Sequence, residues 1–107
     1  MNHLEAREHV HCLDLLRVTS AAGNPVPISD CAILLEIWPL GGLLQTNLAI
    51  AEDTAISIPS VGVEAKVAHC QQDEFGFLVE ISVDSAKWFP EGYVPPHLLL
   101  NPPTVSP

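Results

Sequence analysis

Hydrophobic and polar residues alternate along two stretches in the second half of the chain. Between Val61 and His69 the valines and Ala65 fall on one face, while Glu64 and Lys66 fall on the other. From Phe75 to Val83 every second residue is again a large apolar one. A period of two is typical of a strand with one buried face, so both stretches are predicted to be half-buried strands.

Short polar or proline-containing links connect these strands to each other and to a third. The link Gln71–Glu74 predicts a loop, and the strands on either side of it then form an antiparallel hairpin. Upstream, Thr54–Ile58 is rich in β-forming residues and is predicted to be a strand. Pro59 and Ser60 predict a turn between it and the strand that begins at Val61. The three strands are expected to form a meander.

The first half of the chain adds three more predicted strands, separated by turn signals around Gly23 and Gly41. They are Cys12–Thr19, Cys31–Trp38 and Leu43–Asn47. Six short strands with turns between them predict an all-β fold, a small six-stranded antiparallel barrel. The pattern leaves room for one short helix, at His3–His9 or after Pro95.

Length and composition favour a single domain. The chain has 107 residues, of which 48% are hydrophobic and 16% charged, so it can bury one core. We expect this domain to span residues 1–100, including a C-terminal plug segment over 85–100. Residues 101–107 contain three prolines and are expected to be extended or disordered.

The charge balance excludes two classes of partner. Thirteen acidic residues against four basic ones give a net charge of −9, which repels nucleic-acid backbones and anionic membrane surfaces. We therefore expect no nucleic-acid and no membrane partner. Charged residues near the N-terminus and the lack of a long apolar run predict a cytoplasmic protein.

Cysteines and histidines raise the question of a metal site. Cys12, Cys31 and Cys70 contain no CxxC pair and are expected to be reduced, buried thiols. If Val10 points inward, His9 and His11 share a face, as two metal ligands would. The spacings match no zinc motif, so we expect no metal and no other cofactor. No nucleophile elbow, phosphate loop or metal-binding helix is present, which predicts a protein that is not an enzyme.

The segment from Glu36 to Thr46 and the order of the predicted strands resemble the PilZ domain family. That family carries Asp or Asn, any residue, Ser, two residues and Gly at the end of one strand. Here Glu36, Trp38 and Gly41 stand at these three positions, and the glycine is the one that matches. The resemblance covers roughly residues 5–84 and implies a PilZ-like, split-barrel fold in a bacterial signalling protein.

PilZ domains are typically receptors for the nucleotide cyclic di-GMP. They hold it with an arginine pair spaced RxxxR before the first strand and with the second motif, because guanidinium groups pair with phosphate and with guanine. Arg7 and His11 stand at the two arginine positions of this chain. If ligand binding is retained, the resemblance implies a site at Arg7, His11, Glu36, Trp38 and Gly41.

An aromatic and proline-rich segment, Trp88–Pro96, follows the last predicted strand. One hypothesis is that it folds back, closes one mouth of the barrel and covers an edge strand. The other is that part of it stays exposed as a docking surface for a protein partner or a second copy, since aromatic residues beside proline are typical interface anchors. The docking candidates are Trp88, Phe89, Tyr93, Leu98 and Leu99.

Two functions follow from these patterns. The first is a non-catalytic, PilZ-like regulatory or adaptor domain that acts through protein contacts and has lost cyclic di-GMP binding. The second is an atypical cyclic di-GMP receptor, in which Arg7, Arg17, Glu36 and Trp38 build a modified site and the indole stacks on a guanine. The missing second arginine favours the first.

Overall fold

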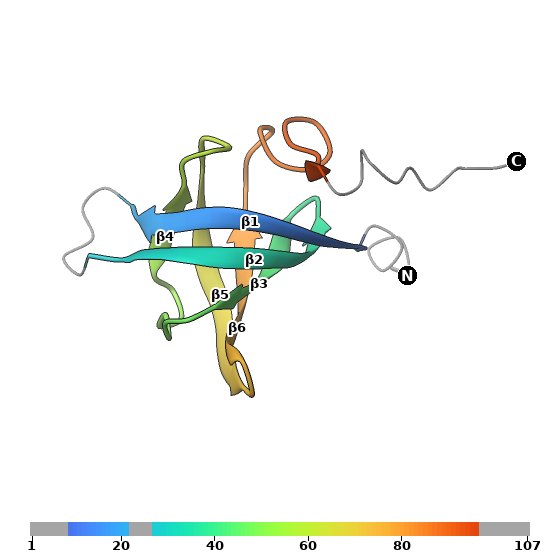
Figure 1. Cartoon of the computed structure of the whole chain (residues 1–107). Coiled ribbons are helices and arrows are strands. Elements are labelled where there is room, and N and C mark those ends of the chain that lie inside the picture. Colours follow the sequence, from blue (N-terminus) through green and yellow to red (C-terminus); the bar gives the residue numbers. More distant parts are fainter. Residues whose placement is uncertain (1–8, 22–26, 97–107) are drawn as a thin grey trace, which may run out of the picture.

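The computed structural model describes residues 9–21 and 27–96, and the description that follows is confined to them. The protein is all-β, as predicted, with six antiparallel strands in one sheet that closes into a ring in the order β1-β2-β3-β6-β5-β4 (Figure 1). The strands are β1 (Val10–Ser20), β2 (Ser29–Trp38), β3 (Gly41–Thr46), β4 (Ala55–Ile58), β5 (Val63–Asp73) and β6 (Gly76–Val83). The described part of the chain contains no helix with the length and hydropathy needed to cross a membrane.

The ring consists of two consecutive meanders. Strands β1, β2 and β3 form the first, and β4, β5 and β6 form the second, which confirms the predicted meander over residues 54–83. Every residue of β3 pairs with β6, from Gly41 with Ser82 to Thr46 with Phe77. The other junction, between β1 and β4, is short and pairs Thr19 with Ser57 and Ser20 with Ile56.

The core consists of the inward-facing residues of all six strands, and an irregularity in β2 decides which residues these are. Leu34 pairs with Leu44 and Glu36 with Leu43, so Leu35 is an extra residue that no position on β3 matches. This β-bulge shifts the alternation by one position. As a result Leu34 and Ile37 are both fully buried, and Glu36 lies on the outer face.

The chain after β6 curls over one mouth of the barrel (Figure 1). Trp88 is fully buried there, and its indole Nε1 donates to the carbonyl oxygens of Trp38 and Gly41, both at 3.0 Å. Tyr93 stacks on Trp88 with ring centroids 5.9 Å apart, and Phe89 is also half-buried against the core. The described part of the expected plug segment therefore packs on the barrel.

Burial removes Trp88 from any exposed docking surface, and Phe89 and Tyr93 present only part of their rings to solvent. Leu98, Leu99 and the segment 101–107 lie outside the described residues. So do the two predicted helix positions, except for His9 in the first and Pro95 and Pro96 in the second. The aromatic residues of the segment thus serve mainly to close the barrel.

The predicted loop at Gln71–Glu74 is wrong for its first three residues. Gln71 pairs with Leu78 and Gln72 with Phe77 inside a longer β5, and the turn consists of Glu74 and Phe75. The hairpin of β5 and β6 projects beyond the other strands (Figure 1), and Gln71 and Gln72 are exposed there, so polar residues can join the ladder. Phe75 lies at the tip of the hairpin and is 75% exposed, although the alternation predicted that it belongs to the buried face of its strand.

The expectation of three buried thiols is also wrong. All three cysteines are free, but only Cys12 is buried, while Cys70 is half-buried and Cys31 is exposed. Cys31 pairs with Arg17 across β1 and β2, at a position that faces outward. Apolar residues occupy both faces of β2, so the alternation alone did not show which face carries the cysteine.

Candidate functional site

The structure brings most of the predicted ligand positions together at the end of the barrel where β1 begins and β2 ends. In the register of these strands His11 pairs with Glu36, and Trp38 pairs with Gly41 across the turn to β3. Four of the five positions implied by the resemblance are therefore adjacent. The fifth, Arg7, lies outside the described residues.

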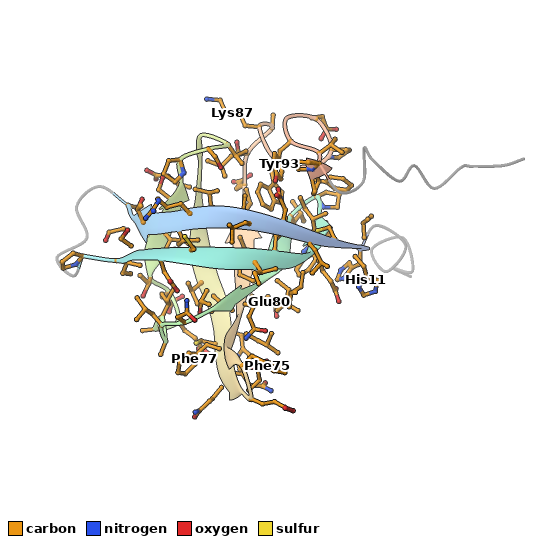
Figure 2. All side chains as sticks on the ribbon, in the orientation of Figure 1. His11, Phe75, Phe77, Glu80, Lys87 and Tyr93 are labelled. Carbon is orange, nitrogen blue, oxygen red and sulfur yellow. The ribbon has the colours of Figure 1, made fainter. Side chains whose placement is uncertain are left out.

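Glu36 lies between two histidines. Its Oε1 is 3.5 Å from Nδ1 of His9, and its Oε2 is 3.7 Å from Nδ1 of His11. Val10 packs against the core, so the residues before and after it both face outward, as the sequence suggested. The Glu36 side chain is 27% exposed and that of His11 is 88% exposed, which makes His11 the open side of the cluster (Figure 2).

The ring of His9 covers one face of the Trp38 indole. The two rings are nearly parallel, 5° apart, with centroids separated by 4.2 Å. A planar ligand cannot stack on this face of the indole while His9 occupies it. The sequence places His9 two residues before His11, on the same face of the strand, but gives no sign of its stacking on Trp38.

Gly41 has a structural reason to be glycine. A Cβ at this position would lie 2.1 Å from the carbonyl oxygen of Ile81 on the neighbouring β6, too close for any side chain. The Gly41 carbonyl oxygen also accepts the hydrogen bond from Trp88. The one residue that matches the PilZ motif is therefore explained by close strand packing.

Beneath the cluster, the thiol of Cys12 is held in its neutral form. Burial, together with the smaller effect of the nearby charges of Asp14 and Glu36, raises the pKa of this thiol from 9.0 to about 11. Burial likewise raises the pKa of Asp14. A neutral thiol is a poor metal ligand, and no group of three or more histidine, cysteine or acidic residues in the described ranges is arranged to hold a metal ion.

Arg17 is remote from the cluster. It lies six residues along β1 from His11, about 20 Å at the usual rise of a strand. Its guanidinium Nη1 donates to the hydroxyl of Ser29 at 2.9 Å, near the opposite end of β2. The prediction that Arg17 joins Glu36 and Trp38 in a modified site is therefore wrong, because Arg17 lies at the opposite end of the β1–β2 pair from these two residues.

Comparison of this chain with protein-family models, with curated proteins and with solved structures gave no match.

Proposed function

We propose that this protein is a non-catalytic regulatory or adaptor domain that acts through protein contacts and has lost the cyclic di-GMP binding that its resemblance to PilZ domains implies. The observation that carries the proposal is the contact of His9 with Trp38 and Glu36. Residues at the implied ligand positions are engaged with the chain's own histidines. A nucleotide that stacked on this face of the indole would have to displace the His9 ring and would meet the carboxylate of Glu36.

Action through protein contacts is supported by apolar side chains on the outer face of the barrel. Leu13 and Leu15 are 63% and 68% exposed, and Ile33 beside Leu15 is also exposed. Single exposed leucines are ordinary on a soluble protein, but neighbouring ones on adjacent strands are typical of interaction surfaces. This face takes over the role that the sequence suggested for the aromatic segment.

A second candidate function is an atypical cyclic di-GMP receptor. It is favoured by the adjacency of His11, Glu36, Trp38 and Gly41 at one end of the barrel. In this version His9 swings away and a guanine takes its place on the indole, with Arg7 as a further contact.

Calorimetric titration with cyclic di-GMP separates the two candidates. We expect no binding to the wild-type protein and none to His9→Ala, in which the indole face is uncovered. The control Leu40→Ser changes an exposed leucine in the turn between β2 and β3 and should behave as the wild type. Micromolar binding that disappears in both Trp38→Ala and Arg7→Ala would establish the second candidate instead.

Site-specific photo-crosslinking in the cells that make the protein tests the contact with a partner. A crosslinking amino acid at position 15 should give a discrete adduct, and the same amino acid at the exposed position 66 on β5 should not. If neither position gives an adduct, the adaptor function fails.

A further inference from the structure

The outer face of strands β1, β2, β3 and β6 carries a row of mainly apolar side chains. Strand pairing places Leu15 beside Ile33, Ile33 beside Gln45, and Gln45 beside Leu78. Leu15 and Ile33 are exposed and the other two are half-buried. Because neighbouring strands are about 4.8 Å apart, these four residues form a continuous row across the barrel, which we call the apolar row.

A second row runs beside the first and is acidic. Glu36, Leu43 and Glu80 are paired in register across β2, β3 and β6. His11 and His69 occupy its two ends, and His69 also contacts Glu52 at 3.1 Å. On β3 and β6 this acidic row lies two residues along the strand from the apolar row, a separation of about 7 Å. Figure 2 labels His11 and Glu80, which belong to the acidic row.

We infer that these two rows form a docking surface for a protein segment in which apolar side chains lie beside lysines or arginines. The inference rests on the proposed function and specifies its partner. Apolar side chains of the segment would cover the apolar row. Its cationic side chains would pair with the exposed Glu80, and with Glu36 by replacing the contacts of His9 and His11 with that carboxylate. Charge complementarity of this kind guides binding and fixes the orientation of the partner.

The charge of the protein favours this occupant over a second copy of the chain. The sequence has thirteen acidic and four basic residues, and Arg17 is the one basic residue within β1 and β2. A second copy would add its own charge of −9 and would offer few cations to the acidic row. A basic partner removes this repulsion and buries the exposed leucines.

The test uses three synthetic peptides of equal length and the isotope-labelled protein. The first alternates leucine with lysine, the second leucine with glutamate, and the third serine with lysine. We expect the leucine–lysine peptide to bind, with the largest amide shifts in the nuclear magnetic resonance spectrum at the two rows, and with weaker binding at high salt. No binding of this peptide, equal binding of the glutamate peptide, or shifts spread evenly over all acidic residues would overturn the inference.

Matched variants assign the contributions of the rows. Leu15→Ser should weaken binding of the leucine–lysine peptide about tenfold, while Leu40→Ser, at a leucine with the same 68% exposure, should not. Glu80→Gln should weaken it about threefold, and Glu64→Gln, at an exposed acidic residue on β5, should leave it unchanged. Equal effects of the variant and its control would contradict the surface.

Two further outcomes separate this inference from the proposed function. Sedimentation experiments could show a dimer that Leu15→Ser dissociates. This result would overturn the inference of a basic partner but would agree with a function in protein contacts. Peptide binding at the two rows without any cellular adduct at position 15 would support the chemistry of the surface and count against the adaptor function.

Discussion

The plugged mouth of the barrel and the outer face of β1 and β2 are both rich in apolar side chains. These side chains are buried at the mouth and exposed on the outer face. At the mouth, Trp88 is fully buried and its indole donates to two carbonyl oxygens, while Tyr93 stacks on it. On the outer face, Leu13 and Leu15 lie in solvent. Chemical type alone would suggest the reverse, since tryptophan and tyrosine are the residues most enriched in interfaces.

The difference shows that partners within the chain decide which apolar residues are available for docking. The single N–H donor of the Trp88 indole is shared by two carbonyl oxygens inside the barrel, so exposing the side chain would leave both oxygens without this hydrogen bond. Leu15 faces away from the core because its neighbour Leu16 occupies the inward position. The mouth therefore contributes to stability, and the outer face remains exposed, as the proposed docking surface requires.

The largest expected effect is at the mouth. Trp88→Ala should lower the free energy of unfolding by about 3–5 kcal/mol, because it removes a fully buried aromatic ring and leaves a cavity. Urea denaturation followed by circular dichroism measures this loss. Trp38→Ala, which removes a half-buried indole stacked on His9, should cost much less. Equal losses in the two variants would mean that Trp88 does not hold the plug.

A thiol inside the barrel, Cys12, should also differ in reactivity from one on the outer face, Cys31. The pKa of Cys12 is about 11 in the folded protein against 9.0 ordinarily, so at pH 8 its thiolate fraction should fall about a hundredfold on folding. Alkylation followed by mass spectrometry should modify the exposed Cys31 in the native protein and Cys12 only after denaturant is added. Modification of both at the same rate without denaturant would contradict the burial of Cys12.

The same pKa shift predicts how stability depends on pH. The unfolded thiol loses its proton near pH 9 and the folded thiol near pH 11, so ionisation favours the unfolded state between these values. The contribution of Cys12 to stability is therefore fully present below pH 9 and is lost as the pH rises toward 11. Cys12→Ala should flatten this part of the pH profile.

A smaller effect is expected where the mouth meets β6. Gly41→Ala should destabilise the protein by about 1–3 kcal/mol, because the new Cβ would collide with the carbonyl oxygen of Ile81 and push β6 away. Thermal unfolding measures the change. Ser82→Ala, at the exposed partner of Gly41 on β6, is the control and should change stability by less than about 0.5 kcal/mol. A stable Gly41→Ala protein would contradict the close packing.

The smallest effect on stability is expected on the outer face. Leu15→Ser should alter the free energy of unfolding by no more than about 0.5 kcal/mol, because the side chain is already exposed. Leu16→Ala, one residue along the same strand but buried, should cost about 2–5 kcal/mol. If Leu15→Ser also unfolds the protein, Leu15 stabilises the fold and the outer face is not free for a partner.

Local pattern was enough to predict the strands, because alternation reports directly on a buried face. It predicted all six strands and the meander at residues 54–83. It failed at Gln71–Asp73, where the ladder continues in water and no buried face imposes alternation. It could not assign the exposed Cys31, because both faces of β2 are apolar and a bulge at Leu35 shifts the phase.

The sequence named four residues that the structure places next to one another, His11, Glu36, Trp38 and Gly41, but it did not predict the contacts among them or the part of His9. The pairing of His11 with Glu36 depends on the register between two strands, which a single sequence does not determine. The stacking of His9 on Trp38 depends on ring orientations that follow from that register. Arg17 lies outside the candidate site for a related reason, because its place along β1 puts it near Ser29, at the opposite end of the β1–β2 pair.

The unequal junctions between the two meanders have a consequence for the folding pathway. Each meander pairs strands that follow one another in the chain, so its contacts are local and can form early. The ring then closes through β3 with β6, along all six residues of β3, and through β1 with β4 at two residue pairs. We expect the junction of β1 and β4 to form last and to open first. The amide proton of Ala21, which donates across this junction to the carbonyl oxygen of Ala55 at 3.3 Å, should then exchange with solvent before those of β3.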